Sequence, residues 1–333
     1  MLVAFLIACV IILGSIIIGI YNNKIVLIYP KTHFHYHGNN TLGLLSNWDS
    51  VNYLSIARHG YTNIKLASFF PLYPLLIRGL YYIIRSYIIS SLIISWLSLV
   101  GAIYFYIKII RQLKFANNLS EIIKSVLFLV LFPTAIFFVA GYTESLFAFL
   151  ALGAIYYVLK HRYLWSSVLL LLAGMCHISA IFILLLVFSL LIEERSKIRY
   201  IIANMVSGGL GIMAFMIILK IKYHNALAFI SSQKKIHKWL VGGYFNIIKS
   251  ASILNIVFIL LVILAAIYFW KKKKSFSLYS LSYLLIPIIG QQYGGFNRYV
   301  LMDFPIQFML YDYFKNKKQA YIYVILISSH DLV

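Results

Sequence analysis

Acidic residues are scarce in this chain of 333 residues, which has eight Asp and Glu against 29 Lys and Arg. Charged residues of both signs make up 11% of the chain, whereas about a quarter of a typical soluble domain is charged. The composition therefore excludes an ordinary soluble globular domain. A hydrophobic content of 62% and a mean hydropathy of +0.90 indicate instead an all-α, polytopic transmembrane helical bundle.

Cysteine is almost absent as well. Cys9 and Cys176 both lie in apolar segments and form no CxxC pair, which argues against a disulfide framework and against a zinc knuckle. The net charge of +21 does not indicate nucleic acid, because the Lys and Arg residues lie between hydrophobic runs and not in one stripe. We expect no nucleic-acid partner, and we expect the basic residues to contact the anionic headgroups of a lipid bilayer.

Apolar segments of near-spanning length recur from one end of the chain to the other, with no soluble-looking stretch between them. They predict about 9 to 11 helices in a single integral membrane domain that covers residues 1–333. We expect the apolar helices at 2–21, 87–107, 125–140, 145–159, 163–176, 178–192, 200–219, 250–270, 276–290, 299–314 and 319–330.

The basic residues of the short loops fall on one side of the predicted bundle, which the positive-inside rule makes cytoplasmic. They are Lys108, Arg111, Lys114, Lys160, Arg162, Arg195, Lys197, Arg199, Lys271 to Lys274, Lys315, Lys317 and Lys318. The opposite side carries two long segments, 22–86 and 220–249. We expect the functional residues on that side, with the catalytic segment in the first extracytoplasmic loop at 22–86.

One of the few acidic residues, Asp49, lies in this first loop beside a tryptophan. Ser46 or Asn47 can cap a helix that starts at Trp48 and ends at Gly60. Asp49 then has two interpretations. It completes a capping box with Ser46 and complements the helix dipole, or it is a functional carboxylate.

A second acidic residue, Glu144, is predicted at the same outer surface, between two apolar helices. An ionisable group at membrane depth costs about 2.5–3.5 kcal/mol, so such residues usually mark a site or an ion pair. The alternative is that Thr143 caps the following helix and Glu144 occupies its first turn. Two unusual carboxylates at one surface favour a functional site.

Four basic residues on the outer side are candidates to bind a phosphate: Arg58, Lys234, Lys238 and Arg298. Arg58 follows Asp49 by nine residues, about half a turn away around a helix, so these two charges cannot pair locally. Arg298 has Asp303 as an alternative partner. Lys234 and Lys238 share a helical face and can clamp a phosphate, or they are snorkelling lysines beside an anchoring Trp239.

Three histidines, His33, His35 and His37, alternate along a short stretch and would share one face of a strand. A divalent metal site is one interpretation of this pattern. No carboxylate and no second histidine cluster lies near it, so we favour a polar loop and expect no cofactor.

Several stretches of the sequence resemble, in family order, the PIG-V type of glycosyltransferase, the second mannosyltransferase of GPI-anchor synthesis and its prokaryotic relatives. They are NWDSVNYLSIARHGY at 47–61, FFPLYP at 69–74, GYTESLF at 141–147, FxxxQ at 229–233 with Trp239, and NRYVLxxFP at 297–305. The matching stretches span most of the chain, and the chain resembles a prokaryotic member of this family. One departure is His177, where relatives often carry an Arg, so no role of that Arg is carried over.

The resemblance implies the GT-C fold, a membrane bundle whose active site faces away from the cytoplasm and uses a polyprenyl or dolichyl phosphate sugar as donor. It implies that Asp49 is the catalytic group. One carboxylate suffices as the base of an inverting transfer, because a phosphate is already a competent leaving group. The candidates for binding donor and substrate are Trp48, Arg58, His59, Glu144, Gln233, Lys234, Lys238, Trp239, Arg298 and Tyr299, with Trp48 and Tyr53 placed to stack on a sugar.

We therefore expect a membrane mannosyltransferase that transfers a hexose, mannose by the resemblance, from a polyprenyl phosphate sugar to a hydroxyl of a lipid-linked or surface glycan, with inversion. It would be a multi-pass protein of the plasma membrane in a prokaryote, or of the endoplasmic reticulum in a eukaryote. The alternative is a transporter or flippase for a lipid-linked substrate, which would hold its acids near the bilayer midplane. Asp49 and Glu144 at predicted helix starts favour the enzyme.

Overall fold

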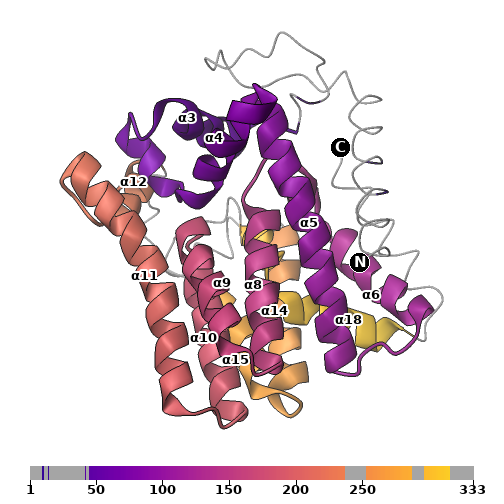
Figure 1. Ribbon diagram of the computed structural model, residues 1–333. Coiled ribbons are helices and arrows are strands. Elements are labelled where there is room, and N and C mark those ends of the chain that lie inside the picture. The colour runs from indigo at the N-terminus through magenta and orange to yellow at the C-terminus, as the bar shows by residue number, and fades with distance from the viewer. Residues whose placement is uncertain are drawn as a thin grey trace.

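The computed structural model describes residues 10, 14, 42, 45–236, 253–286 and 296–315. All regular secondary structure in these residues is helical, in agreement with the predicted class (Figure 1). Apart from residues 10 and 14, the helix predicted at 2–21 lies outside the described residues, as do the helix predicted at 319–330 and the three alternating histidines.

Within the described ranges, two helices, α5 (Tyr87–Gln112) and α11 (Ile198–Tyr223), are long and apolar enough to cross a membrane. Shorter apolar helices are α4 (Leu72–Ile84), α8 (Glu144–Leu159), α9 (Tyr163–Cys176), α10 (Ala180–Glu193) and α14 (Ile253–Trp270). Except for α4, each of these helices lies on a segment that the sequence predicts. Hydrophobic length bounded by basic residues was therefore a sound guide to this part of the fold.

Proline divides the segment predicted at 125–140. The chain forms α6 (Leu119–Val130) and the single turn α7 (Ile136–Val139), with Pro133 between them. A proline inside a helix has no N–H to donate and clashes with the preceding turn, so one continuous helix cannot form here.

The segment predicted at 299–314 is also divided. It forms α17 (Phe296–Val300) and α18 (Phe304–Phe314), and Pro305 occupies the first turn of α18. Proline is tolerated there because the first N–H groups of a helix have no partner within it. The segment predicted at 276–290 corresponds to α15 (Lys274–Tyr283), which ends before the predicted bound, and residues 287–290 lie outside the described part of the chain.

One end of the bundle carries a layer of short helices that lie across its tips (Figure 1). This outer layer consists of α3 (Asp49–His59), η1 (Ile64–Ser68), α4 and α12 (Ala228–Ile236). The sequence predicts α3 but not α4, whose first turn contains Pro74. Three of these helices, α3, η1 and α4, belong to the first long loop, which therefore lies beside the ends of α5 and α8.

The C-terminal end of α11 packs against the outer layer and holds it in place. Phe215 and Leu219 form a small core with Ala67, Phe70 and Ala228. The hydroxyls of Ser68 and Ser232 are 2.7 Å apart, and the Tyr223 hydroxyl donates to the Asn63 carbonyl at 2.6 Å. These contacts hold η1 and α12 together on the same helix.

Glycines bring α9 and α11 into close contact. A Cβ placed on Gly211 would lie 2.1 Å from the Leu171 carbonyl oxygen, and one on Gly174 would lie 2.5 Å from the Gly208 carbonyl oxygen. Small residues at a helix crossing let two backbones approach closely, a packing mode common between helices in membranes.

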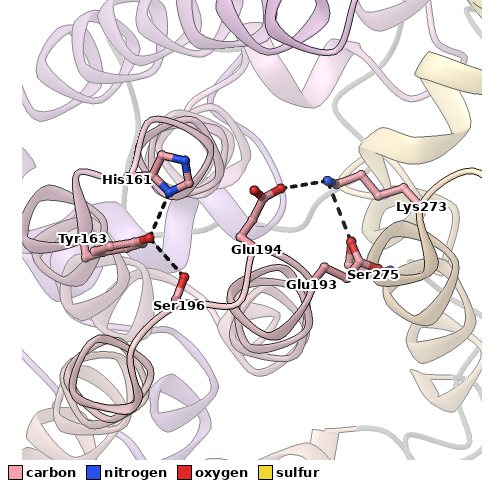
Figure 2. Close-up of polar contacts among 7 residues, drawn as sticks. All are labelled: His161, Tyr163, Glu193, Glu194, Ser196, Lys273 and Ser275. Carbon is pink, nitrogen blue, oxygen red and sulfur yellow. Dashed lines mark hydrogen bonds and ion pairs between the residues drawn. The ribbon is translucent and has the colours of Figure 1, made fainter.

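A polar cluster joins the helices at the opposite end of the bundle, where α11 begins. Lys273 Nζ lies 3.2 Å from Glu194 Oε1 and 3.8 Å from Glu193 Oε2, and Figure 2 shows how these side chains lie. Glu193 also accepts hydrogen bonds from the backbone N–H and the hydroxyl of Ser275, at 2.6 and 2.8 Å. In a second hydrogen-bonded group, also drawn in Figure 2, the Tyr163 hydroxyl contacts both His161 and Ser196. The cluster fixes the end of α10 to the start of α15.

Candidate active site

Arg298, in the short helix α17, joins two carboxylates that are distant in the sequence. Its Nη1 donates to Asp49 Oδ2 at 2.5 Å, across a separation of 249 residues. Its Nε lies 2.9 Å from Glu144 Oε1. The two acidic residues that the sequence singles out therefore meet at one guanidinium.

Asp49 is the first residue of α3, and the segment before it is docked on the start of α8. The Gly141 N–H donates to the Leu45 carbonyl at 2.7 Å, and the Tyr142 hydroxyl donates to the Asn47 carbonyl at 3.0 Å. These bonds fix the direction from which the chain enters α3. The Asp49 carboxylate, 34% exposed, lies at the boundary between the bundle and the outside.

The chain turns sharply into α3 at Trp48. Its φ is 51°, a value that side-chain-bearing residues rarely adopt, and no side chain caps the helix. The capping box open to Ser46 and Asp49 is not formed, because Ser46 Oγ is buried without a hydrogen-bond partner in the described part of the chain. Backbone strain of this kind concentrates at functional sites. The Asp49 carboxylate takes no part in a cap and pairs with Arg298.

Glu144 is the first residue of α8 and is almost completely buried, with 3% of its side chain exposed. Thr143 occupies the N-cap position, but its hydroxyl contacts the Tyr53 hydroxyl at 3.2 Å and does not cap the helix. Within the described residues, Glu144 Oε2 has no hydrogen-bond partner. Its buried charge therefore depends on Arg298.

Aromatic rings surround the Arg298 guanidinium. Its Cζ lies 5.6 Å from the ring centroids of both Phe137 and Tyr142, and 5.7 Å from that of Tyr299. Ring faces attract a cation and exclude water, which strengthens its ion pairs. The sequence includes Tyr299 among the candidates but not Phe137 or Tyr142. Tyr142 lies two residues before Glu144 in the matched stretch 141–147, and this position could have marked it as a site residue.

A narrow pocket lies next to this cluster, lined by Glu144, Phe147, His177, Arg298, Tyr299 and Met302. His177 lies in the connection between α9 and α10, and its Nδ1 accepts from the Ser179 N–H at 3.1 Å. Burial, together with the positive charge of Arg298, lowers the pKa of His177 to about 3. This histidine is therefore neutral at pH 7 and supplies no positive charge to the site.

The other candidates in and before α3 differ in burial. Arg58 and His59 are exposed at the other end of α3, about 13 Å along the helix from Asp49. The Trp48 side chain is 61% exposed. Tyr53 is buried, and its ring packs edge-on against Phe69 and Tyr73.

The remaining candidates are only partly described. Gln233 and Lys234 belong to α12, but their side chains, together with Lys238 and Trp239, lie outside the described part of the chain. Asp303 is buried and accepts from the Ser280 hydroxyl at 2.8 Å, so the Arg298 partners are Asp49 and Glu144. Among the described residues no group of three His, Cys, Asp or Glu side chains is placed to hold a metal ion.

Gly141 permits the close contact between the two halves of the site. A Cβ at this position would lie 2.7 Å from Ser50 Oγ and 2.9 Å from Ser91 Oγ, so Gly141→Ala should displace the start of α3. A misplacement of about 1 Å can lower the rate about 100-fold, so a smaller shift should lower it about tenfold. We expect that loss in an activity assay with little change in melting temperature. Gly79→Ala, where a Cβ would meet nothing within 4 Å, is the control, and full activity of Gly141→Ala would contradict this account of the site.

This chain is similar to proteins of a known family. The family model described as Mannosyltransferase (PIG-V) matches residues 20–201. The human protein GPI alpha-1,6-mannosyltransferase 2 is 33% identical over 144 residues, an alignment that covers 39% of this chain and 28% of the human protein. The matched part of the human relative is thus less than a third of its length. Asp49, Glu144 and His177 lie within the family match, whereas Arg298 follows it in the chain.

Proposed function

Because the chain belongs to the PIG-V family of mannosyltransferases, we propose that it transfers mannose from a polyprenyl or dolichyl phosphate donor to a hydroxyl of a lipid-linked or surface glycan, with inversion. The observation that carries this proposal is the Asp49–Arg298–Glu144 cluster, which combines a partly exposed carboxylate with a fixed cation. These are the two charges that such a transfer needs.

Asp49 is the proposed general base. The acceptor oxygen attacks C1 of the sugar, the bond between C1 and the phosphate oxygen breaks, and the acceptor proton passes to the Asp49 carboxylate. Since the polyprenyl phosphate leaves with the electron pair as a stable anion, no second acid is required. In the structure Arg298 holds one oxygen of Asp49, and one third of the carboxylate is exposed, which lets a hydroxyl approach it.

Arg298 is the proposed partner of the departing phosphate. Guanidinium groups match phosphate oxygens in geometry as well as in charge, and this one is held in place by Glu144 and three aromatic rings. A preorganised cation stabilises the negative charge that develops on the leaving group without costly rearrangement.

The proposed setting is a polytopic GT-C bundle with the site on the extracytoplasmic face, in the plasma membrane of a prokaryote or the endoplasmic reticulum of a eukaryote. The apolar helices support a membrane location, and the outer layer that contains Asp49 lies at the end away from the Lys273 cluster. Asp49 and Glu144 are each the first residue of a helix, whereas a transporter of lipid-linked substrates would hold such acids mid-membrane on broken helices.

The stereochemistry of the product tests the proposed reaction. Purified protein in lipid nanodiscs would receive β-linked polyprenyl-phosphate mannose, labelled with ¹³C at C1, and a lipid-linked mannoside acceptor. The one-bond carbon–hydrogen coupling of the product should show an α-linked mannose, because a single displacement inverts the anomeric centre. A β-linked product would exclude a single base acting on the acceptor, and absence of transfer to any glycolipid acceptor would contradict the function.

A further inference from the structure

The two carboxylates on Arg298 differ in how firmly they are held. Glu144 is 3% exposed and extends from the start of α8, within the bundle. Asp49 is 34% exposed and belongs to the outer layer. Solvent screens an exposed ion pair, whereas separating a buried one leaves an uncompensated charge. Glu144 is therefore the lasting partner of Arg298, and Asp49 is the exchangeable one.

The guanidinium itself is confined. The rings of Phe137, Tyr142 and Tyr299 surround it and Glu144 lies at its Nε, so it cannot swing toward a ligand without losing these contacts. An anion that arrives from the outside must come to Arg298. Nη1 donates to Asp49, which is the more exposed of the two carboxylates, so we expect the anion to reach the guanidinium on the Nη1 side.

The balance of charges at the Arg298 cluster also indicates that a phosphate replaces Asp49 at Nη1. Two carboxylates already face one guanidinium, so a phosphate monoanion added beside them would bring three negative charges to one positive charge. Repulsion between like charges a few ångströms apart in a poorly solvated site costs several kcal/mol. The phosphate is accommodated when the Asp49 carboxylate moves off Nη1.

We infer that the donor phosphate and Asp49 compete for the Nη1 edge of Arg298, so that binding of the lipid phosphate releases the catalytic carboxylate. This inference rests on the proposed function. A carboxylate oxygen that accepts from a guanidinium is a poor acceptor for a substrate proton, and Asp49 is held in this way when no donor is bound. Donor binding then switches on the base, which makes the transfer ordered, with the donor before the acceptor.

Binding of a short lipid phosphate tests the competition without any turnover. Radiolabelled farnesyl phosphate would be titrated into the detergent-purified full chain, with farnesol as the neutral control. Asp49→Asn removes the competing anion, and we expect it to bind farnesyl phosphate about tenfold more tightly than the wild type. Binding of farnesol should not change.

Glu144→Gln is the discriminating variant. It removes the same charge at a similar distance from the guanidinium, 2.9 Å against 2.5 Å, but leaves Asp49 on Nη1. A general electrostatic effect would raise the affinity of both variants equally, whereas competition predicts a gain in Asp49→Asn that is about fivefold larger. Asp312→Asn, which removes a paired carboxylate from α18, controls for the change in net charge.

The outcomes separate the two proposals. If the wild type prefers farnesyl phosphate to farnesol but Asp49→Asn shows no gain, or only the gain of Glu144→Gln, the competition is overturned and the proposed donor class stands. If the wild type binds both lipids equally, the lipid-phosphate donor fails and the competition fails with it. Should Glu144→Gln not fold, the gain of Asp49→Asn over Asp312→Asn decides.

Discussion

Asp49→Asn should lower the rate of mannose transfer by about 10³-fold, because removal of a general base typically costs 10²–10⁴ in rate. The amide has nearly the shape of the carboxylate, and its oxygen keeps only an uncharged, weaker hydrogen bond to Arg298 that a phosphate can displace, so the start of α3 should keep its position. The amide cannot take the acceptor proton. Initial rates measured with saturating donor and acceptor, on protein of matched purity and melting temperature, give the comparison.

Asp312→Asn is the matched control for this substitution. Asp312 is also ion-paired, 3.1 Å from Lys272 Nζ and 2.7 Å from Lys315 Nζ, but it lies in α18 and takes no part in the Arg298 cluster. We expect this variant to retain most of the wild-type rate. Wild-type turnover in Asp49→Asn would remove Asp49 from the role of base.

Arg298→Met should abolish transfer and also destabilise the fold. It removes the cation proposed for the phosphate and leaves Glu144, which is 3% exposed, without its partner. Breaking a buried ion pair from one side typically costs 3–5 kcal/mol, so we expect the free energy of unfolding to fall by about that amount. Thermal unfolding in detergent, followed by the fluorescence of a thiol-reactive or apolar dye, measures the loss.

The double variant Arg298→Met with Glu144→Gln separates stability from catalysis. Removal of both charges leaves no uncompensated carboxylate in the bundle, so most of the lost stability should return. Transfer should remain absent, because the phosphate still lacks its cation. A double variant as unstable as Arg298→Met would show that the guanidinium stabilises the fold through its aromatic contacts and not through Glu144.

Much of the helical bundle could be predicted from the sequence because each of its longer helices corresponds to one continuous apolar segment. The helices α8, α9 and α11 coincide closely with apolar segments that end at charged or glycine-containing loops. Sequence reasoning was less successful where a proline interrupts an apolar segment, because the segment was predicted as one helix and forms two. Pro133 and Pro305 each divide an apolar segment that hydropathy alone treats as continuous.

The helix α4 shows a different difficulty. It lies in the first outer loop, where its proline-rich start, Pro71 to Pro74, indicates irregular structure. Both prolines fall at positions where a helix does not use their missing N–H, so the helix forms nevertheless. Its buried residues Tyr73 and Ile77 pack on the bundle, a tertiary contact that no local pattern reveals.

The composition of the candidate site could be predicted better than its pairing. Scarcity of carboxylates singled out Asp49 and Glu144, and the expected topology placed Arg298 on the same side. No rule of spacing could pair residues 249 positions apart, and the nearby Asp303 was the natural alternative for Arg298. Spacing along α3 predicts that Arg58 points away from Asp49, and the structure places both residues in this one helix, at its two ends.

The position of a bound lipid phosphate tests the central claim most directly. Cryo-electron microscopy of the protein in nanodiscs with a long-chain polyprenyl phosphate should show the phosphate in hydrogen-bond contact with the Arg298 guanidinium, and Asp49 turned away from Nη1 but within reach of the phosphate. Density for the phosphate at the end that carries Lys273, or an Asp49–Arg298 pair left intact beside a phosphate bound elsewhere, would contradict the account.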